Sequence, residues 1–216
     1  MAFPAKQGLY DPAFEHDACG LGFVARLDRR AEHQVVHQGL EILRNLTHRG
    51  AAGCDPCTGD GAGILLQLPH ELYRDQVPFP LPPRGDLAVA MCFFAQAPGR
   101  RRRQEAILEA AVLRYRQEVL GWRDVPIDIS AIGPLARSSM PRIRQLFIRR
   151  TCAAADFERI LFIIRKRAYT EVRNAGEPGT HFWYVASISC RTLVYKGMLM
   201  PGQVDQYFPD LRAADM

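Results

Sequence analysis

Three short clusters in the first third of the chain hold the residues that could carry chemistry. They are Cys19-Gly20-Leu21-Gly22, His48-Arg49-Gly50 and the glycine-rich run 58–63. Glycines beside the cysteine leave room for a substrate or another backbone to approach. The basic tripeptide ends a predicted helix, where the helix dipole favours cations. The same residues would also serve a strand, a capped helix and a tight turn, so their spacing leaves both catalysis and plain structure open.

The run 58–63 (TGDGAG) contains enough glycine to present backbone N–H groups to a phosphate. It lacks the Gly-Lys-Ser/Thr of a Walker loop. It also precedes a predicted strand, whereas a dinucleotide fingerprint follows a strand and opens a helix. We therefore interpret Gly59, Asp60, Gly61 and Gly63 as a structural loop.

Cys54 and Cys57 form a CxxC pair, which could indicate zinc or redox chemistry. A zinc site needs four ligands, and the next candidates, His70 and Cys92, lack metal-site spacing. A redox CxxC is expected after a strand of a thioredoxin-like unit. We therefore expect no metal site here and regard both cysteines as structurally incidental.

The net charge of +5 and the pI near 9.0 raise the question of a nucleic-acid partner. Basic residues cluster only at 100–103 and 165–167, and no RNA or DNA motif accompanies them, so a solvated surface is favoured over a phosphate-binding patch. We do not expect residues 1–18, which hold Asp11, Glu15 and Asp17 and no long apolar run, to be a secretory signal. The longest apolar run, 87–95, is far shorter than the ~20 residues of a membrane helix. We expect a cytoplasmic protein with no nucleic-acid or membrane partner.

The elements that must position these clusters follow from hydrophobic periodicity. Strands are predicted at 20–27, 64–68, 86–95, 125–132, 143–149, 182–190 and 192–195, and the strand at 86–95 is apolar without alternation, as expected for burial on both faces. Helices are predicted at 33–48, 103–120 and 154–168, and 78–83 is a proline-rich connector. This order indicates a layered domain with both helices and sheets.

Together these motifs resemble the class II glutamine amidotransferase domain of glutamate synthases. The resemblance rests on 19–25 (CGLGFVA), 47–51 (THRGA) and 58–65 (TGDGAGIL), with 9–12 (LYDP) before them and 189–199 (SCRTLVYKGML) after them. The His-Arg-Gly tripeptide is shared with other class II amidotransferases, whereas TGDGAG and the segment 189–199 resemble the glutamate synthase branch alone.

The resemblance implies an α+β fold, the four-layer αββα sandwich of the N-terminal-nucleophile hydrolases, incomplete at the C-terminus. Residues 1–18 would be a propeptide, and 19–216 the N-terminal, truncated portion of the amidotransferase domain. Cys19 would be the nucleophile and, once N-terminal, also the general base. Arg49 and Gly50 would lie in the substrate pocket.

The implied chemistry follows from two matched pKa values. A free cysteine thiol titrates near ~8.5 and an α-amino group near ~7.7–8.0. An amine freed on Cys19 could therefore accept the thiol proton. The thiolate would attack the side-chain amide of L-glutamine and release ammonia for transfer to 2-oxoglutarate. Water would then hydrolyse the glutamyl thioester to glutamate.

The family also implies partners and elements that this chain does not contain. The partners are the remainder of the large subunit and its small subunit. FMN and an iron–sulfur cluster are implied for the full-length family, and no cofactor for this chain. Two later elements, His-x-Arg-Phe-Ser-Thr-Asn for the glutamine carboxylate and Asn-Gly-Glu for the oxyanion hole, are absent from the 216 residues.

Loss of one oxyanion donor costs ~10²–10³ in rate. We therefore expect the chain alone to be inactive as a glutaminase. An inactive remnant or an interaction module of the same family is the alternative, and a free-standing glutaminase is disfavoured.

Overall fold

Two antiparallel sheets organise the chain in a computed structural model, which describes residues 6–8, 20–28, 30–50, 55, 57–175 and 183–216. The strands are β1 (Ala62–Gln67), β2 (Leu87–Phe94), β3 (Glu118–Asp124), β4 (Arg142–Arg149), β5 (Tyr184–Ser189) and β6 (Thr192–Gly197). The helices are α1 (His33–Asn45), α2 (His70–Arg74), α3 (Pro98–Arg114), α4 (Pro134–Ser139), α5 (Ala154–Asn174) and α6 (Val204–Tyr207). Short 3-10 turns are η2 (Thr47–Arg49), η3 (Ile129–Ala131), η5 (Pro201–Gln203) and η6 (Pro209–Arg212). The predicted α+β class is confirmed.

The larger sheet has the strand order β3-β4-β2-β5, and all its neighbours are antiparallel. Its central strand β2 is buried on both faces, as predicted. Val89 and Met91 belong to one hydrophobic core, whereas Ala90 and Cys92 belong to the other. Because side chains alternate along a strand, β2 separates the two cores.

Helices α3 and α5 cover one face of this sheet and contact each other. The predicted apolar stripe of α5 is confirmed, because Phe157, Leu161, Ile164 and Ala168 are all fully buried. These side chains, at helical spacing, fill the core between helix and sheet.

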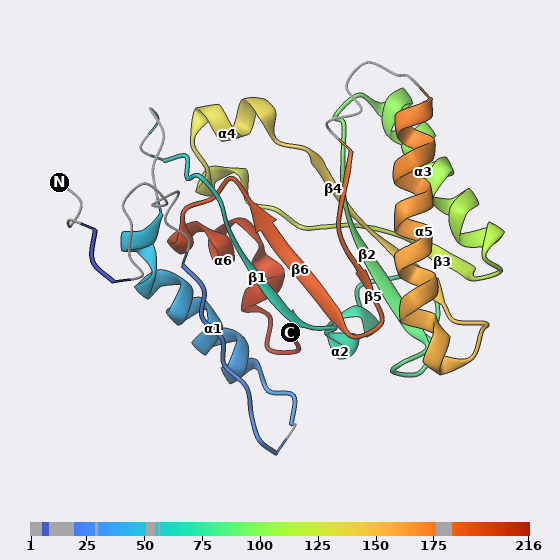
Figure 1. Ribbon diagram of the computed structural model, residues 1–216, viewed down its shortest axis with the longest axis horizontal. Coiled ribbons are helices and arrows are strands. Elements are labelled where there is room, and N and C mark those ends of the chain that lie inside the picture. The colour runs from blue at the N-terminus through green and yellow to red at the C-terminus, as the bar shows by residue number, and fades with distance from the viewer. Residues whose placement is uncertain (1–5, 9–19, 29, 51–54, 56, 176–182) are drawn as a thin grey trace.

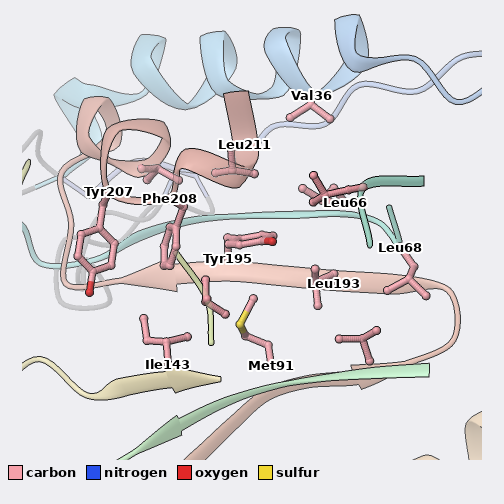
Figure 2. Packing of buried hydrophobic residues seen from close by; sticks show 14 of the residues in the cluster. Val36, Leu66, Leu68, Met91, Ile143, Leu193, Tyr195, Tyr207, Phe208 and Leu211 are labelled. Carbon is pink, nitrogen blue, oxygen red and sulfur yellow. The ribbon is translucent and has the colours of Figure 1, made fainter. Parts of the chain in front are cut away.

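The smaller sheet pairs β1 with β6 and lies toward the other face of the four-stranded sheet. Figure 1 shows α1, the β1–β6 sheet, the four-stranded sheet and the α3–α5 pair following one another across the molecule. Figure 2 shows the core beneath α1, where Tyr195 lies beside Phe208 and Leu211. The last described segment of the chain thus fills the space between α1 and the sheets. No helix in the described part has the length and apolar character to cross a membrane.

The predicted strand at 20–27 is wrong. In this segment the residues form no sheet pairing, and Leu21 and Phe23 are 92% and 90% exposed. A strand needs a partner, and among the described strands β1 and β6 pair only with each other. The segment instead runs beside α1, where a Cβ on Gly22 would lie 2.3 Å from Ile42.

The predicted helix at 103–120 and strand at 125–132 are also placed wrongly. Helix α3 begins earlier because Pro98 lies in its first turn, where its missing N–H is no loss. It ends before Arg116, which has a positive φ of 55°, and β3 begins directly afterwards. Within 125–132 the chain forms η3, because the Asp128 side chain accepts a hydrogen bond from the Ser130 N–H.

A buried polar network crosses the core between the larger sheet and η6. The Arg123 guanidinium donates to both carboxylate oxygens of Asp210 at 2.8 and 2.9 Å, and both side chains are 5% exposed. Arg123 also donates to Gln145, and the Tyr195 hydroxyl donates to Asp210 at 2.9 Å. Burial lowers the pKa of Arg123, but its bonds to Asp210 outweigh this and leave the pKa raised. Both charges are therefore held in the interior by mutual pairing.

Asp210→Ala should lower the free energy of unfolding by about 3–5 kcal/mol, because it leaves Arg123 buried without its carboxylate. Urea denaturation provides the measurement. The matched control is Glu118→Ala, which breaks an exposed pair with Arg149 and should cost less than about 1 kcal/mol. Equal losses in the two variants would show that the buried pair has no special role.

Candidate functional site

The predicted nucleophile Cys19 lies outside the described residues, which resume at Gly20. The residue two positions on, Leu21, lines a hollow of 680 Å³ together with Gly61 and Gly63. The chain at 20–21 is therefore beside the glycine-rich loop, although the two are far apart in the sequence. The structure brings these two predicted clusters together.

The second cluster is positioned by the carboxyl end of α1. The Thr47 hydroxyl donates to the carbonyl of Arg44, and the His48 ring nitrogen Nδ1 lies 3.0 Å from the carbonyl of Asn45. These contacts add side-chain partners to carbonyls in the last turn of the helix. Arg49 ends η2, its side chain lying outside the described part, and the N–H of Gly50 donates to Thr47.

Gly50 lies close to the glycine-rich loop, since a Cβ at this position would lie 3.6 Å from Asp60 Oδ1. Gly59 is buried against the backbone of 199–200, where a Cβ would be 2.4 Å from the Leu199 oxygen. A Cβ on Gly63 would lie 2.6 Å from the Tyr195 oxygen. Gly59 and Gly63 are thus required by close backbone packing.

Asp55 anchors the loop that leads to these glycines. Its carboxylate accepts hydrogen bonds from the Cys57 N–H, the Thr58 hydroxyl and the Leu135 N–H. The Cys57 and Thr58 bonds lead the causes that lower the pKa of Asp55. The Cys57 carbonyl accepts from the Gln203 side chain and from the Gly133 N–H. The Asp55 carboxylate and the Cys57 carbonyl therefore hold this loop in place, and no hydrogen bond among the described residues involves the Cys57 thiol.

The 680 Å³ hollow beside the loop is lined mainly by apolar groups from β1, β6, α4 and the start of β4. Lys196 is the one Lys, Arg, Asp or Glu among the described residues of its lining. Its ammonium donates to the Tyr184 hydroxyl at 3.0 Å, which lowers the pKa of that phenol. The hollow could take a small amphiphilic molecule whose anionic end faces Lys196.

The described cysteines differ in how readily they could form a thiolate. Burial raises the pKa of Cys92 far above its usual range. Burial, with a hydrogen bond to Glu158, raises the pKa of Cys190 to about 11. Neither thiol is suited to nucleophilic attack near neutral pH. Within the described ranges, no three His, Cys, Asp or Glu side chains are grouped as metal ligands would be.

Sequence reasoning missed the residues that support the loop from outside. Asp55 was visible only as the interior of a CxxC pair, although Asp before Pro is a common turn signal that could have identified it. Leu199 and Gln203 carry no such signal. Their role depends on a contact between segments about 140 residues apart.

The family model of the class-II glutamine amidotransferases matches residues 19–216. The chain therefore belongs to this family, and the resemblance predicted from its motifs is confirmed.

Three curated relatives place the chain more narrowly. It is 44% identical to the glutamate synthase [NADPH] large chain of Bacillus subtilis, over 97% of this chain and 14% of the relative. It is 37% identical to the glutamate synthase [NADH] of Saccharomyces cerevisiae, over 98% of this chain and 10% of the relative. It is 35% identical to the ferredoxin-dependent glutamate synthase 2 of Synechocystis, over 92% of this chain and 13% of the relative. The chain spans only a small part of the length of these relatives.

Gly59→Ala should lower the free energy of unfolding by about 1–3 kcal/mol, because the new Cβ meets the Leu199 backbone. The matched control is Gly202→Ala, where a Cβ has nothing within 4 Å. Thermal denaturation of both variants gives the comparison. A neutral Gly59→Ala would mean that the loop does not pack on 199–200.

Asp55→Asn should destabilise the protein at neutral pH and progressively less in acid. The folded-state pKa of Asp55 is lowered, so its stabilising contribution is present above the unfolded value near ~3.9. It is lost as the pH falls through the lower folded pKa. Urea midpoints of wild type and variant should thus converge below about pH 4. The control Cys57→Ser should leave the urea midpoint unchanged at every pH. A difference between the midpoints of wild type and Asp55→Asn that does not depend on pH would contradict this account.

Proposed function

We propose that this chain is the glutamine-hydrolysing part of a glutamate synthase, releasing ammonia from L-glutamine for transfer to 2-oxoglutarate. The observation that carries the proposal is the family match, which starts at Cys19 and includes the His-Arg-Gly and glycine-loop motifs. The printed names of the relatives support the glutamate synthase branch.

In the proposed reaction Cys19 acts as nucleophile and general base. Removal of residues 1–18 frees its α-amine, which accepts the thiol proton. The thiolate attacks the amide carbon of glutamine, and the leaving nitrogen takes a proton and departs as ammonia. Water then cleaves the thioester, giving glutamate and restoring the thiol. An uncut chain could not do this, because an amide nitrogen is not a base.

Arg49 and Gly50 are proposed to border the substrate. The proximity of Gly50 to Asp60, and the hollow shared by Leu21, Gly61 and Gly63, support this assignment. Gly59, Asp60, Gly61 and Gly63 would shape the pocket without chemistry of their own.

We further propose that the layers form the αββα sandwich of N-terminal-nucleophile hydrolases, completed by additional chain. Two-stranded sheets are marginally stable alone, and β1–β6 has unpaired edges among the described strands. Leu21 and Phe23 are 92% and 90% exposed in a segment without sheet pairing. Strands added beside 20–27 would cover these side chains and give the segment the pairing it lacks.

The same additional sequence is proposed to supply the carboxylate-binding and oxyanion elements, so residues 1–216 alone would not hydrolyse glutamine. FMN and the iron–sulfur cluster would likewise belong to the remainder of the large subunit. The described residues do not fit the iron–sulfur cluster, since no three Cys, His, Asp or Glu side chains are grouped among them. The small subunit is a further proposed partner.

In the protein extended as in the curated relatives, the Ala18–Cys19 bond should be cut and glutaminase activity should depend on Cys19. The glutamine analogue 6-diazo-5-oxo-norleucine should alkylate Cys19 alone among the six cysteines, because only Cys19 combines an amine with a substrate pocket. Intact-mass and peptide mass spectrometry identify both events.

The controls are Cys19→Ala, which should release no ammonia, and Cys57→Ser, which should retain full activity. Full activity with an uncut N-terminus would contradict the proposed mechanism, and a label on Cys57 or Cys92 would show that the nucleophile is wrong. An extended protein that never hydrolyses glutamine would favour an inactive remnant or interaction module.

A further inference from the structure

Helices α3 and α5 present an outer surface that the proposed glutaminase chemistry does not use. Both pack on the four-stranded sheet through buried apolar side chains, so their opposite sides face away from it (Figure 1). Their ten basic and five acidic residues give a net charge of +5, equal to that of the whole chain. The excess charge is therefore concentrated in this one layer.

Charge is also segregated by exposure within the layer. The exposed charged residues of the two helices are all basic, namely Arg102, Arg103, Arg114, Arg159, Lys166 and Arg173. The five carboxylates are half-buried, and each has a partner. Three form ion pairs: Glu105 with Arg144, Asp156 with Arg159, and Glu171 with Arg167. The other two accept hydrogen bonds, Glu109 from Trp122 and Glu158 from Ser189. A surface selected only for solubility would mix both signs.

The start of α3 carries this charge against local preference. Four consecutive arginines, 100–103, fall at the start of the helix, and its first turn has no acidic residue. The helix dipole disfavours cations at this end, and like charges three residues apart repel. A nearby anionic surface would relieve both effects.

Apolar side chains lie among the exposed cations. Leu113 and Phe162 are 60% and 56% exposed, and Ile163 is at the border of exposure. The Lys166 ammonium lies 5.5 Å from the centre of the Phe162 ring. Aromatic and arginine side chains together are typical of the centre of protein interfaces and not of a solvated face. We call these three residues and the six exposed cations the α3–α5 face.

We propose that the α3–α5 face docks against an acidic surface with an apolar centre, located in the remainder of the same glutamate synthase polypeptide. The inference rests on the proposed function, under which the chain is one part of a much longer protein. A second copy would present the same positive charge and be repelled. A nucleic acid would gain nothing from Leu113 and Ile163, and no recognition motif accompanies the cations.

The test uses the extended protein and a zero-length carbodiimide, which joins a lysine amine to a carboxylate in direct contact. The sequence has three lysines, so Lys166 is readily followed by peptide mass spectrometry. Lys166 should link to an Asp or Glu beyond this chain and be acetylated several-fold more slowly than in the isolated chain. Arg173→Glu should weaken the link several-fold. The control Arg191→Glu, an equal charge change on the exposed β5–β6 turn, should not.

The proposal is overturned if Lys166 is acetylated equally fast in both proteins and forms no link. It is also overturned if the link joins two copies, or if ribonuclease removes the protection. Cys19→Ala distinguishes the proposed function from the proposed docking, because it should abolish ammonia release while leaving the Lys166 link intact. Loss of glutaminase alone therefore bears on the proposed function and not on docking.

Discussion

The bidentate pair between Arg123 and Asp210 joins the larger sheet to the last described segment of the chain. Arg123 is on β3 of the larger sheet, Asp210 is in η6 near the end of the chain, and Tyr195 joins them from β6 of the smaller sheet. Each charge is desolvated and depends on the other, so the network tolerates little displacement. It fixes the segment 204–212 against both sheets.

That segment in turn holds the elements around the site. The His33 ring donates to the Leu211 carbonyl, and Arg44 pairs with Asp205 at 2.8 Å, so both ends of α1 are attached to it. Just before it, Gln203 donates to the Cys57 carbonyl. The carboxyl end of α1, which leads to Gly50, and the loop that carries Gly59 are thus positioned from the same place. The site depends on residues that do not border it.

The buried strand and the apolar helix face were predictable from local sequence pattern, whereas contacts between distant segments were not. The uninterrupted apolar run of β2 and the helical stripe of α5 are set by burial, which sequence periodicity reports directly. The segment 20–27 has the composition of a strand, but pairing depends on a partner that composition does not show. Likewise, Arg123 and Asp210 look like ordinary surface residues in the sequence. Only the long-range contact between them reveals a buried pair.

The central claim is that Cys19 attacks glutamine at the place where Gly50, the glycine-rich loop and the 680 Å³ hollow meet. A crystal structure of the extended protein, with a glutamine-derived adduct on Cys19, tests it most directly. The account predicts that the adduct lies against Gly50 and Gly61, with its carbon chain toward that hollow. An adduct directed instead into the larger hollow of 1100 Å³ between 20–26, α1 and Gln67 would contradict it.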